Sequence, residues 1–174
     1  MDDQGRAFLE AALPHLDVVY RVAWHASRDH HRAEDLVQET YLRAFAAFDG
    51  HRGPSTKAWL VTICLNLARS EGRRRARRVV ETALPEPYEP EALGVSVPEE
   101  AMTNIDRAAV SRALAQVPVE QRLAIVLMDL AGHSASEVAE MLGCPRNTVL
   151  SRVHRGRQRL ASLLVGEDIN RDVP

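Results

Sequence analysis

Several features that would place a chain in a common class are scarce in these 174 residues. The two cysteines, Cys64 and Cys144, lie 80 positions apart, a spacing that fits neither a disulfide framework nor a zinc site. No apolar run approaches the roughly 20 residues that a membrane span needs, and the first ten residues lack the basic start and apolar stretch of a signal peptide. We therefore expect a cytoplasmic protein without membrane contact of its own, in which both cysteines are small core residues.

Aromatic residues are also few. They make up 5% of the chain, whereas hydrophobic residues as a whole make up 45%. Aromatic and β-branched side chains are enriched in strands, so a core built from Leu, Val and Ala suits helices better than sheets. The composition argues against an all-β fold and favours an all-α fold.

The sequence signatures of catalysis are missing as well. There is no G-x-S-x-G, no P-loop, no H-E-x-x-H and no dinucleotide-binding fingerprint. His25, His30 and His31 lie close in sequence, but without a carboxylate or cysteine at ligand spacing a solvated helix junction explains them better than a metal site. We expect a protein that is not an enzyme and holds neither a metal nor a cofactor.

Opposite charges nearly cancel over the whole chain, which carries 22 basic and 24 acidic residues and has a pI near 6.4. This total argues against a uniformly basic surface of the kind that binds polyanions. The charges are unevenly distributed, however, with a net +3 over residues 1–78, −7 over 79–106 and +2 over 107–174. Residues 79–106 hold seven acids, four prolines and no basic residue, a composition that builds no packed core. We expect an acidic, Pro-rich flexible linker between two small helical domains.

The N-terminal domain, residues 1–78, has helical periodicity throughout. One helix is predicted after Pro14, a residue that suits the first turn of a helix. A second has a broad apolar stripe over residues 36–48 and opens at Asp29 or a neighbouring residue. A third begins near Ser55 and continues into the segment ARSEGRRRARR.

The C-terminal domain, residues 107–165, also has helical periodicity, but its predicted helices are shorter. Residues 166–174 are expected to form a tail. One helix is predicted to stop at Gly132. Ser134 and Glu137 form a capping box for the next helix.

The segment that follows this capping box carries the strongest local signal. Ala139, Gly143 and Val149 stand at relative positions 0, +4 and +10. A small residue lets two helices approach, glycine suits a left-handed turn and an aliphatic residue locks the second helix onto the first. The spacing predicts a helix-turn-helix whose second helix opens at Pro145.

That second helix is strongly basic and has no acid between positions 145 and 159. A structural helical hairpin or a solvated basic face could show the same spacing, but neither requires five arginines in 14 residues. The composition favours a reader of the DNA major groove. The residues expected to face base edges and phosphates are the early ones: Arg146, Asn147, Thr148, Ser151 and Arg152.

A second basic cluster lies at the end of the third N-terminal helix, with Glu71 as the only opposing charge. Six arginines exceed what stabilisation of a helix end requires, and such a cluster predicts salt-sensitive contacts with phosphates. Lys57, Asn66 and Arg69 are expected on one exposed face of the same helix. The cluster consists of Arg69, Arg73, Arg74, Arg75, Arg77 and Arg78.

Together these residues resemble a known family, the extracytoplasmic-function group of bacterial RNA polymerase sigma factors. The resemblance rests on three blocks in the family's order: HRAEDLVQETYLRAF, then KAWLVTICLNLARSEGRRRAR, then ALAQVPVEQRLAIVLMDLAGHSASEVAEMLGCPRNTVLSRVHRGRQRL. It implies a two-domain helical protein that binds core RNA polymerase and directs it to promoter DNA. It also implies an anti-sigma factor as a partner that holds the protein inactive.

The resemblance assigns a role to each block. The DLVQET segment would dock on core polymerase through Asp35, Leu36, Gln38 and Glu39. The promoter element near minus ten would be recognised and opened by a loop and the helix after it, with Asp49, His51, Arg52, Lys57, Asn66, Arg69, Arg73 and Arg74. The element near minus thirty-five would be read by Arg146, Asn147, Thr148, Ser151, Arg152 and Arg155.

This chain departs from the family's usual pattern at two positions near the base-reading surface. Asn147 stands where a glycine is common, and Leu150 where a basic residue is common. The promoter sequence therefore cannot be taken over from relatives.

Two other interpretations remain open at this point. A stand-alone helix-turn-helix regulator explains residues 107–165 equally well, but it gives no role to the arginine cluster at 69–78 or to the DLVQET segment. A structural adaptor that uses its helices only for protein contacts leaves both basic helices unexplained.

Overall fold

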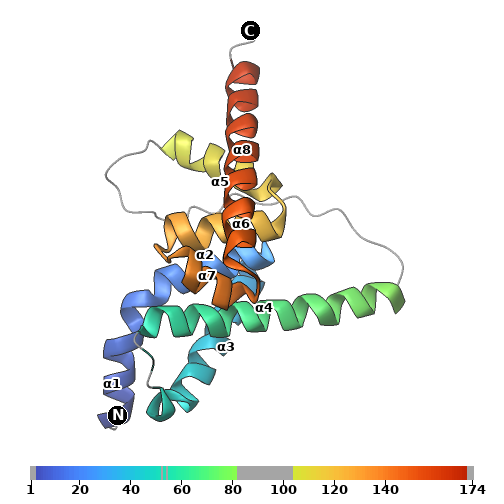
Figure 1. Cartoon of the computed structure of the whole chain (residues 1–174). Helices are drawn as coiled ribbons and strands as arrows, with labels where there is room; N and C mark the ends of the chain where they lie inside the picture. Colours follow the sequence, from blue (N-terminus) through green and yellow to red (C-terminus); the bar gives the residue numbers. More distant parts are fainter. Residues whose placement is uncertain (1–2, 52, 54, 82–103, 172–174) are drawn as a thin grey trace.

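The computed structural model describes residues 3–51, 53, 55–81 and 104–171, and every regular element in these ranges is helical (Figure 1). The N-terminal region contains α1 (Asp3–Ala12), the short turn η1 (Leu13–His15), α2 (Leu16–Ser27), α3 (His30–Ala46), the turn η2 (Phe48–Gly50) and α4 (Thr56–Glu81). The C-terminal region contains α5 (Asn104–Gln116), α6 (Val119–Ile125), the π-helical turn η3 (Val126–Leu130), α7 (Ala135–Leu142) and α8 (Arg146–Arg171). The expected all-α fold with two helical regions is confirmed.

Local signals begin α3 and α4 near the positions that the sequence predicted. The Asp29 side chain accepts a hydrogen bond from the backbone N–H of Arg32 at 3.0 Å and so caps α3. At the start of α4, the Ser55 hydroxyl accepts from the N–H of Ala58 at 3.2 Å. One non-glycine residue among those described, Arg28, adopts a left-handed conformation, with φ +56°, and reverses the chain between α2 and α3.

An additional helix, α1, packs on α3 through aromatic side chains. The ring of Phe8 meets Tyr41, Phe45 and Phe48 edge-on, with centroids 5.3 to 6.2 Å apart. The Tyr41 hydroxyl donates to the carbonyl of Ala12 at 2.9 Å and satisfies the last turn of α1. Four of the eight aromatic residues of the chain thus gather in one small cluster.

The helix-turn-helix forms as its spacing predicted. The Ser134 and Glu137 capping box is present at the start of α7. Gly143 ends α7 with φ +62°, and Val149 on α8 is fully buried against the first helix. At Gly156 an added Cβ would lie 2.7 Å from the Cδ1 of Ile125, so glycine lets α8 cross α6 at close range.

The two regions pack against each other and share one hydrophobic cluster that runs from Phe8 to Val153. The contacts between them join α2 to α6 and η3, and α4 to α7. Arg122 on α6 lies at this joint, with 4% of its surface exposed. Its guanidinium donates to the carbonyl of His25 in the N-terminal region at 2.9 Å, and to those of Ala115 and Val117 at 3.1 and 3.0 Å. One buried cation therefore satisfies the ends of two helices from different regions.

The helices are longer than the expected boundaries allowed. α4 continues to Glu81 and α5 begins at Asn104, so both ends of the predicted linker at 79–106 are helical, and its middle lies outside the described residues. α8 continues to Arg171, which places most of the expected tail in a helix. The expected boundaries missed these helix ends, because an acidic composition does not stop a helix that has already formed.

None of the helices in the described ranges has the length and apolar character that crossing a bilayer requires.

Candidate nucleic-acid interface

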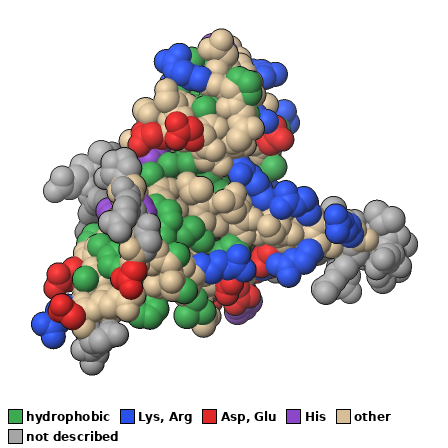
Figure 2. Space-filling model, turned by 60° about the horizontal axis from the view of Figure 1, so that its bottom comes forward, with side chains coloured by type: hydrophobic (Ala, Val, Ile, Leu, Met, Phe, Trp, Pro, Cys, Tyr) green, Lys and Arg blue, Asp and Glu red, His purple; other side chains and the backbone are tan. Residues whose placement is uncertain are grey.

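The second half of α4 extends away from the body of the molecule and presents a basic surface (Figures 1 and 2). Arg73, Arg74, Arg75 and Arg77 are exposed, and none of them forms an ion pair with another described residue. Closer to the body, Arg69 donates to the Asn66 side chain at 3.4 Å. These guanidinium groups keep most of their donors free, which suits contact with phosphates.

The loop before α4 holds an aromatic stack that the sequence did not predict. The imidazole of His51 lies parallel to the indole of Trp59, with ring centroids 4.1 Å apart and an angle of 9° between the planes. Gly53 lies close to the same ring, since a Cβ there would come within 2.8 Å of the Cε1 of His51. Asp49 accepts a hydrogen bond from Gln4, while Arg52 lies outside the described residues. Trp59 is half-buried rather than fully in the core.

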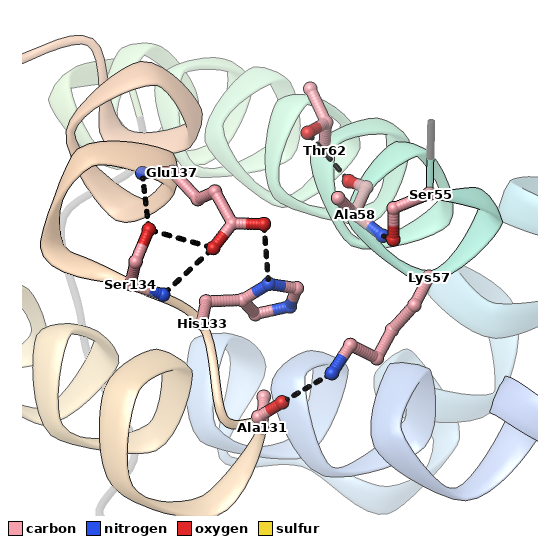
Figure 3. Close-up of polar contacts among 8 residues, drawn as sticks. All are labelled: Ser55, Lys57, Ala58, Thr62, Ala131, His133, Ser134 and Glu137. Carbon is pink, nitrogen blue, oxygen red and sulfur yellow. Dashed lines mark hydrogen bonds and ion pairs between the residues drawn. The ribbon is translucent and has the colours of Figure 1, made fainter. Parts of the chain in front are cut away.

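Lys57, at the start of α4, faces the C-terminal region instead of open solvent. Its ammonium donates to the carbonyl of Ala131 at 2.8 Å (Figure 3). Beside it lies His133, which is buried and has its Nδ1 3.9 Å from a carboxylate oxygen of Glu137. Burial and the nearby Lys57 charge lower the pKa of His133. In this arrangement a predicted promoter contact is occupied by the other region of the same chain.

The outer face of α8 carries three polar side chains and one apolar side chain in helical register. Asn147, Leu150, Ser151 and His154 follow i, i+3, i+4 and i+7 spacing and lie opposite the buried Val149. All four are exposed or half-buried. His154 and Gln158 belong to this face although the sequence did not single them out, because their charge and type are unremarkable until the register of the helix is known.

The other residues of α8 that the sequence predicted to contact DNA differ in their exposure and in their contacts. Arg146 is exposed at the first turn, and Thr148 is half-buried. Arg155 is exposed and donates to the Ser151 hydroxyl at 3.3 Å. Arg152 lies on the flank of the helix, where it pairs with Glu120 of α6 and places a guanidinium nitrogen 3.5 Å from the sulfur of Cys144.

A second arginine of α8 is also paired across the domain. Arg157 makes two hydrogen bonds with Asp129 of η3, one of them 3.0 Å long, and these bonds raise the pKa of the guanidinium. The sequence did not predict the pairs of Arg152 and Arg157, since the partners lie 32 and 28 positions away. Both arginines tie α8 to neighbouring elements of its own domain, Arg152 to α6 and Arg157 to η3.

The segment predicted to dock on polymerase lies on α3. Asp35 and Gln38 are exposed, and Glu39 pairs with Arg43 one turn later at 2.6 Å. Leu36 is 1% exposed and packs in the core, so its side chain is not part of the outer surface. A groove beside this face is lined by Leu13, Pro14, Leu16, Asp17, Tyr20, Glu34, Val37 and Gln38.

The histidines at the junction of α2 and α3 occupy different environments. His25 is buried, and burial together with the charges of Arg122, Arg21 and Arg28 lowers its pKa to about 4. His30 accepts or shares a hydrogen bond with the Tyr20 hydroxyl at 2.7 Å and lies 3.1 Å from Glu34. Within the described ranges no group of His, Cys, Asp and Glu is arranged to hold a metal ion.

Cys64 is fully buried and Cys144 half-buried, and both are free thiols. Burial raises the pKa of Cys64 to about 12, which keeps the thiol protonated and inert.

Comparison with known families defines the class of the protein. The family model for sigma-70 region 2 matches residues 12–78, and the one for sigma-70 region 4 matches residues 107–160. These matches cover the two helical regions described above, one bearing α3 and α4 and the other the helix-turn-helix. The fold and the two basic helices thus define a sigma-70-type transcription initiation factor that binds DNA through the helix-turn-helix of region 4 and is not an enzyme.

Individual relatives narrow the class. SigE of Mycolicibacterium smegmatis is 39% identical over 156 residues, which are 89% of this chain and 60% of that protein. EcfG of Rhodopseudomonas palustris is 36% identical over 165 residues, covering 94% of this chain and 87% of that protein. Both are ECF RNA polymerase sigma factors. The chain belongs to the ECF family of RNA polymerase sigma factors.

Two solved structures have the same fold. One is the sigma factor RpoE in complex with the anti-sigma factor NepR from Bartonella quintana, with a TM-score of 0.76 and 32% identity, covering 91% of this chain and 97% of that one. The other is CnrH in complex with the cytosolic domain of CnrY, with a TM-score of 0.63 and 26% identity, covering 93% of this chain and 90% of that one.

Proposed function

We propose that this chain docks on core RNA polymerase through the outer face of α3, contacts the promoter near minus ten through α4 and the loop before it, and reads the element near minus thirty-five through α8. The observation that carries the proposal is the exposure of two separate basic helices, each within a matched sigma region. A stand-alone regulator would need only α7 and α8. The arginines of α4 and the polar face of α3 acquire roles only if polymerase is bound.

The docking surface consists of Asp35, Gln38 and Glu39, with Leu36 holding the helix in place from the core. The adjoining groove exposes Leu13 and Leu16, which are 50% and 43% accessible. Apolar groups rimmed by acids are typical of a protein interface. Residues 1–78 would form the polymerase and minus-ten domain, 79–106 an acidic tether and 107–165 the minus-thirty-five domain.

The minus-ten contacts would divide into two groups. Arg69, Arg73 and Arg74 would neutralise phosphates, and Asn66 would offer an amide to a base edge. Asp49, His51, Arg52 and Lys57 would hold the opened strand near the stack of His51 on Trp59. For α8 the corresponding set is Arg146, Asn147, Thr148, Ser151, Arg152 and Arg155.

An anti-sigma factor would hold the chain inactive in the bacterial cytoplasm. Two features support this part of the proposal. The related RpoE and CnrH structures are complexes with an anti-sigma factor and with the cytosolic domain of CnrY, respectively. In this chain Lys57 is bound to Ala131 and α4 packs on α7, so the two DNA-binding regions are held together rather than spread along a promoter. A partner that stabilises this packing would keep Lys57 from DNA.

Reconstituted transcription tests the function. The full chain, mixed with purified core polymerase, should direct run-off transcription from a promoter near its own gene. The double variant Asp35→Asn, Gln38→Ala should bind core polymerase weakly, whereas the matched surface variant Glu140→Gln on α7 should bind like the unmodified chain. Failure of the unmodified chain to bind core polymerase, with any inhibitor removed, would overturn the proposal.

The same preparation separates the sigma factor from a dimeric regulator. A regulator would bind a palindromic duplex tightly without polymerase. A sigma factor should show weak or no specific binding alone and promoter-dependent transcription once the core enzyme is added.

A further inference from the structure

The DNA-facing side of α8 carries an apolar side chain among polar ones. Leu150 exposes 38% of its surface, whereas Val149 and Val153 on the opposite side of the helix expose 0% and 4%. Leu150 is therefore not part of the core that holds the helix-turn-helix together. It lies one turn after Asn147 and one turn before His154 on the same face.

The edge of DNA that such a face meets offers one apolar feature. In the major groove the base pairs present hydrogen-bond donors and acceptors, together with the 5-methyl group of thymine. Leu150 has no group that can form a hydrogen bond with a base, and an apolar contact with that methyl group is the way in which it can discriminate between base pairs. Guanidinium groups can read guanine, but two of those on this helix are held by acids of the same domain, Arg152 by Glu120 and Arg157 by Asp129.

We propose that Leu150 is a specificity-determining residue that reads the methyl group of a thymine in the promoter element near minus thirty-five. The inference rests on the proposed function, since it requires α8 to lie in the major groove. Asn147 and Ser151 supply polar contacts on either side, and Leu150 makes the recognition of one base pair depend on a methyl group. The alternative is that Leu150 contacts a protein partner, and it predicts a different result for the Leu150→Ala variant.

Removal of the methyl group from DNA tests the contact directly. Promoter templates are made in which each thymine of the minus-thirty-five element is replaced, one at a time, by deoxyuridine, which pairs identically but lacks the 5-methyl group. Run-off transcription by the holoenzyme is then measured on every template. Loss of one buried methyl contact is expected to lower the output of the unmodified chain about fourfold at a single position.

Variants of Leu150 test whether this residue is the one that contacts the methyl group. Leu150→Ala should lose a similar factor on the unmodified template and show no further loss with deoxyuridine at the sensitive position. Leu150→Met, which keeps an apolar side chain of similar size, should retain the response. Val165→Ala is the matched control, since Val165 is a 60% exposed aliphatic residue on the same helix, about 22 Å further along.

Three outcomes are decisive. If no thymine responds, or if the unmodified chain and Leu150→Ala respond alike, the inference is overturned. If Leu150→Ala weakens binding to core polymerase rather than the response to deoxyuridine, Leu150 contacts protein and the inference is also overturned, while the proposed function stands. If the unmodified chain transcribes none of the templates, the proposed function itself has failed.

Discussion

The two basic helices, α4 and α8, differ in how many of their arginines are paired with acids. On α4, a helix that projects from the body, Arg73, Arg74, Arg75 and Arg77 are exposed and form no ion pairs with other described residues (Figure 2). On α8, Arg152 and Arg157 pair with acids of their own domain. A free guanidinium adapts to phosphates wherever they lie, whereas a paired one holds a helix in a defined orientation. The same residue type is thus exposed and unpaired along the second half of α4 and held by acids at two positions of α8.

A third use of arginine appears at the joint between the regions. Arg122 is buried without an acidic partner in the described part of the chain and donates to three carbonyls. Burial and the nearby Arg28 lower its pKa to about 10, which still leaves it charged at neutral pH. Its role is therefore structural.

Arg122→Met should have the largest effect on stability. The substitution leaves the carbonyls of His25, Ala115 and Val117 without their donor, and we expect the free energy of unfolding to fall by about 3 kcal/mol or more. Urea denaturation followed by circular dichroism measures the change. The matched variant Arg155→Met, on an exposed face, should unfold within about 0.5 kcal/mol of the unmodified chain. Equal effects of the two substitutions would contradict the structural role of Arg122.

Neutralising the free arginines of α4 should act on binding rather than on stability. Replacement of Arg73, Arg74, Arg75 and Arg77 by Gln removes up to four phosphate contacts, so the slope of log affinity against log salt should fall by about 3.6 and affinity should drop roughly 100-fold at low salt. Promoter binding by the holoenzyme over a potassium chloride series measures both. The corresponding Lys variant keeps the charges and should keep most of the slope. An unchanged slope in the Gln variant would show that these arginines do not touch DNA.

The joint between the regions should weaken in mild acid. The unfolded chain protonates His25 near pH 6.5, but the folded chain does so only near pH 4, so the unfolded state binds more protons between these values. Stability should therefore fall by roughly 2 to 3 kcal/mol as the pH drops through this window. Denaturation at pH 7 and pH 5 checks the direction. His25→Gln should flatten this dependence, whereas His154→Gln, at an exposed position, should leave it intact.

Substitution of Arg152 and substitution of Arg157 should change promoter binding by different amounts, although both arginines form ion pairs with acids. If Arg152 also reads a base edge, Arg152→Ala should cost roughly 1 to 3 kcal/mol of promoter binding and relax preference at one position. Arg157→Ala removes an exposed pair on the far flank and should cost about 0.5 kcal/mol or less. Binding of the holoenzyme to promoters with single base changes separates the two. A uniform loss across all sequences would mark Arg152 as a phosphate contact.

Much of the fold followed from local signals. The cap at Asp29, the capping box of Ser134 and Glu137 and the left-handed Gly143 each act within one turn of a helix, so short stretches of sequence predicted them correctly. The three blocks of the resemblance likewise identified the family. The helix ends at Glu81 and Arg171 were not predicted, because amino-acid composition does not show where a helix that has already formed will stop.

The candidate site was predictable in its composition but not in its geometry. Asn147 and Arg146 are exposed as expected, while Leu36 proved to be a core residue and Lys57 faces Ala131. The stack of His51 on Trp59 had no sequence signal, since it joins a loop to the helix after it.

The sequence by itself determined the helical class, the uneven charge along the chain, the two basic helices and the family, because each depends on residue type and short spacing. Only the tertiary structure decided which arginines are free and which are held. The pair of Arg152 with Glu120 spans 32 positions, and the bond from Arg122 to His25 spans 97. Contacts at such distances exist only once the helices have packed, and packing depends on the whole set of apolar faces rather than on any one segment.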